Sequence, residues 1–271
     1  MNRIVELFRN KSEQILNIYF TAGFPTLENT VPVLEALSEA GVDLIEIGMP
    51  YSDPVADGET IQQSNQKALE NGISIKRLFE QLSGIREKVK VPILLMGYLN
   101  PVVQFGVEDF CRRCAEVGID GLILPDLPVD VYKEEYKGIF DRYGILNIFL
   151  ITPQTIESRI RKIDEVSDGF IYMVSSASTT GSQKGITDEM KAYFSRIKEM
   201  NLRNPRLIGF GIKDYETFHT ACAYANGAIV GSAFVRLLEQ NQENQRAAIL
   251  NYVSSLRHSH QVEKIFSNLS A

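Results

Sequence analysis

A single carboxylate interrupts an apolar run near the start of the chain. Glu46 lies in the middle of Leu44–Gly48, and the loop that follows carries two more carboxylates, Asp53 and Asp57. An ionised group inside a buried strand costs free energy unless it is paired or used. Burial raises the pKa of a carboxyl group, which suits proton transfer near neutral pH. Glu46 is therefore a candidate acid/base, and the alternative is a structural glutamate paired with a buried Lys or Arg.

The two aspartates of the loop Pro50–Gly58 have an ordinary explanation as well. Aspartate is common in turns and at helix starts, and the residues predict a helix over Thr60–Leu69. Two aspartates directly after a strand that carries Glu46 nevertheless favour a site. The residues alone leave Asp57 open between a helix cap and a catalytic group.

Small residues recur at three points in the second half of the chain. Thr179-Thr-Gly181, Gly209-Phe-Gly211 and Gly231-Ser232 each follow a predicted strand. Glycine has no Cβ, so backbone N–H groups can approach an anion closely, and a helix that starts at Ser232 adds its dipole. We expect a phosphate site at these points, with ordinary turn glycines as the alternative.

Two tyrosines lie near predicted strand ends, and the cysteines and histidines suggest no site. Tyr98 follows the third strand and Tyr172 lies in the sixth, so each is either a core aromatic or part of a pocket wall. Cys111 and Cys114 share the apolar stripe of one predicted helix, which favours a core role over redox chemistry. The three histidines are scattered, and we expect neither a metal site nor a Ser-His-Asp triad.

The elements that must position these residues alternate regularly. Eight short apolar runs predict strands: Ile15–Phe20, Leu44–Gly48, Val91–Met96, Gly121–Leu124, Asn147–Ile151, Gly169–Val174, Leu207–Phe210 and Ala228–Val230. Amphipathic helical segments separate them, which indicates parallel strands covered on both faces. We predict one α/β domain over residues 1–271, a (β/α)8 TIM barrel, rather than an open doubly wound sheet. An extra helix precedes the first strand, and a short phosphate-site helix, Ala233–Leu238, follows the eighth. Sites in such barrels lie at the carboxyl ends of the strands.

The composition excludes several classes of protein. The chain has 271 residues, 44% of them hydrophobic, and a net charge of −6, which disfavours a broad nucleic-acid-binding surface. Three cysteines suggest a reducing compartment rather than a disulfide scaffold. We find neither a signal peptide nor a membrane span, and we expect a cytoplasmic protein.

Six segments together resemble the tryptophan synthase alpha subunit family. The most specific is Glu46–Gln62, which is similar to the signature of that family. Five others match in order over nearly the whole chain: Phe20–Pro25, Met96–Pro101, Leu124–Pro128, Gly209–Ile212 and Gly231-Ser232.

The resemblance implies a β/α barrel that cleaves indole-3-glycerol phosphate to indole and glyceraldehyde 3-phosphate, a retro-aldol reaction without a metal or organic cofactor. Glu46 resembles the general acid/base, Asp57 the residue that hydrogen-bonds the indole N–H, and Tyr172 a hydroxyl that assists. The phosphate cradle would consist of Gly181, Gly211, Gly231 and Ser232, and the pocket wall of Tyr19, Tyr98 and Thr180.

The resemblance also implies a partner, a beta subunit that carries pyridoxal phosphate, in an alpha-beta-beta-alpha assembly. Asp53 and Pro54 lie in the loop that resembles the docking element. One departure from the family pattern is Ser178-Thr179, which could alter closure of a loop over the site.

Three alternative functions stay open. One is a weakly active subunit that mainly activates the partner. The others are an indole-glycerol-phosphate synthase, for which we find no convincing catalytic lysine, and a sugar-phosphate epimerase, for which we find no metal ligands.

Overall fold

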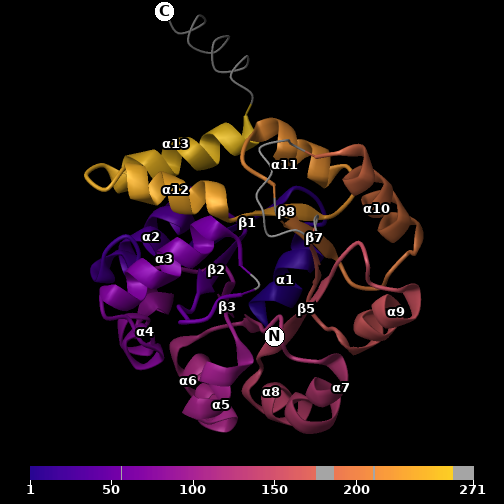
Figure 1. Ribbon diagram of the computed structural model, residues 1–271, viewed down its shortest axis with the longest axis horizontal. Helices are drawn as coiled ribbons and strands as arrows, with labels where there is room; N and C mark the ends of the chain where they lie inside the picture. Colours follow the sequence, from indigo (N-terminus) through magenta and orange to yellow (C-terminus); the bar gives the residue numbers. More distant parts are fainter. Residues whose placement is uncertain (56, 175–185, 210, 259–271) are drawn as a thin grey trace, which may run out of the picture.

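Eight parallel strands form a closed barrel in which each strand pairs with its neighbours in the sequence and β8 pairs with β1. The computed structural model describes residues 1–55, 57–174, 186–209 and 211–258 (Figure 1). The strands are β1 (Ile15–Thr21), β2 (Leu44–Gly48), β3 (Ile93–Met96), β4 (Gly121–Ile123), β5 (Leu146–Ile151), β6 (Ile171–Val174), β7 (Arg206–Gly209) and β8 (Gly227–Val230). The predicted TIM barrel is confirmed, and an open sheet was the wrong alternative.

Helices surround the barrel as an outer ring, except for α1, which lies over the centre of the barrel (Figure 1). They are α1 (Arg3–Asn10), α2 (Thr30–Glu39), α3 (Glu59–Glu70), α4 (Ile75–Gln81), α5 (Leu99–Phe105), α6 (Val107–Val117), α7 (Val129–Val131), α8 (Lys137–Tyr143), α9 (Glu157–Val166), α10 (Asp188–Glu199), α11 (Tyr215–Cys222), α12 (Ser232–Gln240) and α13 (Gln245–Arg257). Short turns of other helix types are η1 (Leu27–Asn29), η2 (Ile85–Glu87) and η3 (Tyr132–Tyr136).

Some strands begin later than their apolar runs predict. The run that starts at Val91 pairs as a strand only from Ile93. Pro92 explains the delay, because it has no N–H to donate to the sheet, although its carbonyl still accepts from the Ile45 N–H at 3.1 Å.

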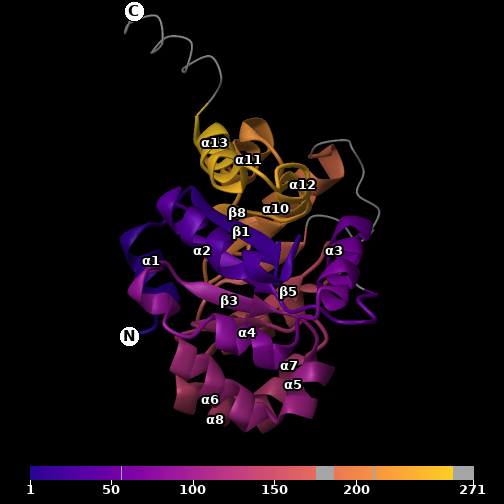
Figure 2. The ribbon, with the colours of Figure 1, turned by 90° about the vertical axis from the view of Figure 1, so that its left-hand side faces the viewer.

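Two apolar layers hold the barrel together. The inner layer fills the lumen with strand residues such as Leu44, Leu94 and Ile229, and Ile4 of α1 joins it from below. Phe8 of the same helix packs against Phe170 with 5.8 Å between ring centroids. The outer layer lies between the strands and the ring of helices. Helix α1 therefore closes one end of the lumen, and α3 lies at the opposite side of the molecule (Figure 2).

Acidic or amide side chains cap strands at the closed end of the barrel. Asp43 accepts from the Leu16 N–H at 2.8 Å and Asp120 accepts from the Ile93 N–H at 2.9 Å. Both carboxylates also have cationic partners, which are Lys11 and Arg257 for Asp43 and Arg3 and Arg86 for Asp120. Asn226 accepts from the Arg206 N–H in the same way, at 2.9 Å. These three side chains thus accept from N–H groups at or near the starts of β1, β3 and β7, which would otherwise lack a partner.

Candidate active site

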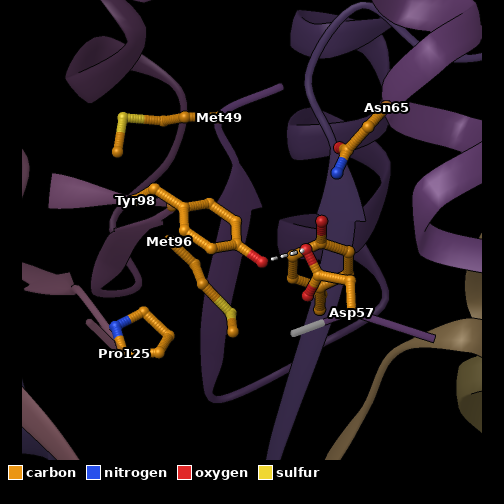
Figure 3. A pocket seen from close by; sticks show the side chains of 8 residues that line it. Met49, Asp57, Asn65, Met96, Tyr98 and Pro125 are labelled. Atoms are coloured by element: carbon orange, nitrogen blue, oxygen red, sulfur yellow. Dashed lines mark hydrogen bonds between the residues drawn. The ribbon is translucent and has the colours of Figure 1, made fainter. Parts of the chain in front are cut away.

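A pocket opens at the carboxyl ends of β1, β2 and β3. Its empty space, including solvent at the open mouth, is about 310 Å³, and its wall consists of Tyr19, Met49, Asp57, Asn65, Met96, Gly97, Tyr98 and Pro125. Figure 3 shows the Tyr98 hydroxyl pointing across the pocket to the Asp57 carboxylate. Two of the predicted pocket residues, Tyr19 and Tyr98, therefore meet the predicted catalytic residue Asp57 in one cavity.

Glu46 lies beside this pocket, inside the lumen, and is 0% exposed. Its side chain faces inward because Leu44, two residues before it on β2, belongs to the inner layer. The Asn17 amide donates to Oε1 of Glu46, and Oε2 has no hydrogen-bond partner among the described residues. Among the described residues, Glu46 is therefore not a structural glutamate paired with Lys or Arg.

Burial controls the protonation of Glu46. Desolvation raises the pKa of its carboxyl group to about 8, and the hydrogen bond from Asn17 lowers this pKa in part. With a pKa near 8, the carboxyl group is mostly protonated at neutral pH, so it is ready to give up a proton.

Asp57 is not the cap of the following helix. Helix α3 begins at Glu59 with Gly58 as its N-cap residue and no side-chain capping bond. The Asp57 Oδ2 atom instead accepts from the Tyr98 hydroxyl at 3.3 Å. Burial raises the pKa of Asp57 to about 6 and the Tyr98 bond lowers it, so the group is mostly ionised at neutral pH. Of the two readings that the residues left open, the structure excludes the cap.

Two glycines make room for two tyrosine rings in the lumen. A Cβ on Gly48 would lie 2.1 Å from the Tyr19 hydroxyl oxygen, and one on Gly209 would lie 2.3 Å from that of Tyr172. Burial raises the pKa of both phenols far above the usual value, so both stay protonated and can donate. Tyr172 is 5% exposed and does not line the pocket, but the Glu46 and Asp57 charges both raise its pKa, so it lies within their electrostatic reach.

The predicted phosphate residues lie at the ends of neighbouring strands. β7 pairs with β8, Gly211 follows β7, and Gly231 directly precedes α12, whose first residue is Ser232. Gly211 has a φ of +76°, a conformation that favours glycine. Gly181 and Thr180, like Ser178 and Thr179, lie outside the described residues.

The predicted docking residues lie in the loop between β2 and α3. Asp53 is exposed and accepts from the Ser52 hydroxyl at 2.5 Å, and Pro54 is half-buried. The neighbouring Val55 is 81% exposed, which is unusual for a large apolar side chain.

Other predicted features belong to the core or remain unused. Cys111 and Cys114 are buried in α6, and burial raises the pKa of both thiols, which confirms the core interpretation. No group of three or more His, Cys, Asp or Glu side chains could hold a metal ion within the described ranges. No helix in those ranges is long and apolar enough to span a membrane.

Sequence reasoning missed two polar residues of the site, Asn17 and Asn65. Asn17 lies in a strand that is otherwise nearly all apolar, and it is as deeply buried as Glu46. Its polarity within that run was the available signal. Asn65 lines the pocket from α3, and its Oδ1 atom is buried with no hydrogen-bond partner among the described residues.

Comparison with known proteins identifies the family. The family model for the tryptophan synthase alpha chain matches residues 6–263. The tryptophan synthase alpha chain of Flavobacterium johnsoniae is 56% identical over 257 residues, covering 95% of this chain and 100% of the relative. That of Bacteroides thetaiotaomicron is 54% identical over 249 residues, covering 92% of this chain and 97% of the relative.

Solved structures agree with the sequence comparison. The tryptophan synthase alpha subunit of Legionella pneumophila superposes with a TM-score of 0.84 at 31% identity, covering 95% of this chain and 97% of the other. A chain of the tryptophan synthase complex from Pyrococcus furiosus gives a TM-score of 0.82 at 33% identity, covering 91% and 98%. The chain belongs to the tryptophan synthase alpha chain family and is a carbon–carbon lyase of tryptophan biosynthesis.

Proposed function

We propose that Glu46 moves the proton, and that Asp57 holds the indole ring, in the cleavage of indole-3-glycerol phosphate to indole and glyceraldehyde 3-phosphate. The observation that carries this proposal is the difference in pKa between two carboxyl groups that both act on Tyr19 and Tyr172. The pKa of Glu46 is raised to about 8 and that of Asp57 only to about 6. At neutral pH one is a proton donor and the other a carboxylate, which is the division of roles that the reaction needs.

The reaction balances with Glu46 as the only proton carrier. The protonated carboxyl group gives its proton to C3 of the indole ring, which leaves a positive charge on the ring. Glu46, now a carboxylate, takes the proton of the glycerol hydroxyl beside the C3 side chain. The bond between C3 and the glycerol carbon breaks, its electron pair returns to the ring, and the hydroxyl carbon becomes the aldehyde. Glu46 ends protonated, as it began.

Asp57 stabilises the charge that develops on the ring. Its carboxylate would accept a hydrogen bond from the indole N–H and so attract the positive charge in the transition state. The Tyr98 hydroxyl, 3.3 Å from Oδ2 of Asp57, orients that carboxylate. Tyr19 forms part of the pocket wall, and Tyr172 supplies a neutral hydroxyl close to Glu46 and Asp57.

The phosphate of the substrate binds across the mouth of the barrel, near the ends of β7 and β8. Gly211, Gly231 and Ser232 supply backbone N–H groups and the start of α12, which is nine residues long and carries a favourable dipole. We add Gly181 to the phosphate cradle and Thr180 to the pocket wall because both match the family pattern.

A beta subunit is the proposed partner, in an alpha-beta-beta-alpha assembly that holds pyridoxal phosphate in beta and no cofactor in this chain. Solved relatives include a tryptophan synthase from Mycobacterium tuberculosis in an aminoacrylate-bound form and the complex from P. furiosus. Exposed Asp53 and Val55, with half-buried Pro54 between them, support docking through the loop after β2. We also propose that residues 1–271 act as one barrel domain. The cytoplasm is the proposed location, and three free cysteine thiols suit a reducing compartment.

Glu46→Gln tests the proton transfer. Release of indole from indole-3-glycerol phosphate should fall by about 100-fold or more, because one general acid–base group contributes that much, while substrate binding persists. Near-normal turnover would exclude Glu46 as the acid/base. The unaltered chain is assayed with and without beta subunit, and a background rate in both cases would favour the merely activating subunit.

A further inference from the structure

Asn17 and Glu46 form a hydrogen-bonded polar pair inside the lumen. Both are 0% exposed, and the Asn17 Nδ2 atom donates to Oε1 of Glu46. Each partner keeps one more polar atom, Oδ1 of Asn17 and Oε2 of Glu46, that is buried without a hydrogen-bond partner among the described residues. A buried polar atom left without a partner calls for an explanation.

The chemistry of an amide suits a group that must change its protonation state. Lys and Arg can only donate hydrogen bonds, so either would stabilise the carboxylate alone and hold the pKa of Glu46 low. An amide offers both a donor and an acceptor, so it can bond to a carboxylate and to a carboxylic acid. The Asn17 bond lowers the pKa of Glu46 only in part, and the carboxyl group keeps its proton at neutral pH.

We infer that Asn17 is a positioning residue that holds Oε1 of Glu46 and thereby leaves Oε2 as the oxygen that carries the transferred proton. This inference rests on the proposed role of Glu46 as acid/base. Oε1 is occupied by the amide N–H, so the proton of the resting acid sits on Oε2. That proton goes to the substrate carbon, and the proton of the glycerol hydroxyl returns to the same oxygen.

The other titratable groups around Glu46 are few. Tyr19 on β1 and Tyr172 on β6 face it as neutral phenols, and Asp57 comes from the loop after β2. On β3 the residue in register is the apolar Leu94. In the described part of the chain no cation shifts the pKa of Glu46. A change at Asn17 should therefore act on Glu46 directly.

Two variants test the inference, Asn17→Val and Asn17→Asp. The first removes the amide, and the second nearly keeps its shape but places a second carboxyl group beside Glu46, so that a pH profile remains measurable if the first does not fold. Asn147→Val is the matched control: Asn147 is also buried in a strand, but its register partner Leu122 belongs to the outer layer.

The alkaline limb of the lyase pH profile should move up by about one pH unit in both Asn17 variants, the shift expected when a hydrogen bond to a charged group is lost or a like charge is added. The kcat should fall by about 10-fold to 100-fold, since the acid is no longer held in place, with KM nearly unchanged. The control should keep the wild-type limb. An unmoved limb in both Asn17 variants would overturn the inference.

An infrared titration separates this inference from the proposed function. The C=O band of protonated Glu46 is identified by its loss in Glu46→Gln, and its pH midpoint is measured without substrate. An active Glu46→Gln enzyme would overturn the proposed role of Glu46, and with it the inference that rests on that role, whatever the infrared midpoint. An inactive one, together with an unchanged infrared midpoint in Asn17→Val and Asn17→Asp, would overturn the role of Asn17 alone.

Discussion

Replacing Glu46 by Gln should make the chain more stable at neutral and alkaline pH, although we expect it to lower lyase turnover by about 100-fold or more. Gln has nearly the same shape, and its carbonyl oxygen can still accept the hydrogen bond from Asn17. The substitution removes only the titration. The pKa of Glu46 lies at about 8 in the folded chain and near the ordinary value of 4.5 in the unfolded one. A raised pKa in the folded state stabilises the fold fully below the unfolded pKa, and this contribution is lost as the pH rises through the folded pKa.

The magnitude follows from the width of that pH window. Each unit of pKa difference corresponds to about 1.4 kcal/mol, so between pH 5 and pH 8 ionisation of Glu46 in the unfolded chain should cost the wild type roughly 3 kcal/mol of stability. Glu46→Gln has no carboxyl group to ionise at this position. Its free energy of unfolding should therefore rise relative to that of the wild type by roughly 3 kcal/mol between pH 5 and pH 8.

Urea denaturation at several pH values measures this difference directly. The free energies of unfolding of wild type and Glu46→Gln are compared at pH 5, 6, 7 and 8. Glu134→Gln is the matched control, because it removes one exposed carboxyl group and leaves Glu46 in place. If the wild-type and Glu46→Gln curves stay parallel over this range, burial does not shift the pKa of Glu46 and the reasoning fails.

Three further predictions concern the same end of the barrel. The lyase kcat/KM should rise with pH as Asp57 ionises near pH 6 and fall as Glu46 ionises near pH 8, and a profile without the alkaline limb would contradict the role of Glu46. Gly48→Ala should lower the free energy of unfolding by about 1–3 kcal/mol, because the new Cβ overlaps the Tyr19 ring; equal thermal stability of variant and wild type would show that the ring moves freely. Tyr98→Phe removes a hydrogen bond that lowers the pKa of Asp57, so the acid limb should shift to higher pH, and a limb that shifts to lower pH would exclude this effect.

The sequence predicted the eight strands because each is a short, mostly apolar run between amphipathic helices, and this pattern is local. It could not tell which face of Leu44–Gly48 lines the lumen, since both faces of a barrel strand are buried. The packing of Leu44 in the inner layer decides this. The sequence also could not predict contacts between residues on different strands. Gly209 contacts the ring of Tyr172, and Asn17 bonds to Glu46, but no local pattern indicates either contact.

The family resemblance assigned roles that spacing alone left open. From its position before a helix, Asp57 could be a helix cap or a catalytic group. The structure excludes the cap, because Gly58 is the N-cap residue of α3. Thr180 and Gly181 lie outside the described residues, and their roles, like those of the other site residues, remain predictions.

The buried acids at the two ends of the barrel differ in the charge of their partners. At the closed end, Asp43 and Asp120 are neutralised by lysine and arginine side chains. At the open end, the hydrogen-bond donors to Glu46 and Asp57 among the described residues are an amide and a phenol. Added salt screens exposed ion pairs strongly and buried ones much less, and it leaves bonds to neutral donors nearly unaffected. The cations Arg3, Lys11 and Arg257 at the closed end are partly exposed, so salt still reaches their pairs. Higher ionic strength should therefore weaken the ion pairs of Asp43 and Asp120 at the closed end. The pKa values of Glu46 and Asp57 at the open end should change little over a wide range of salt.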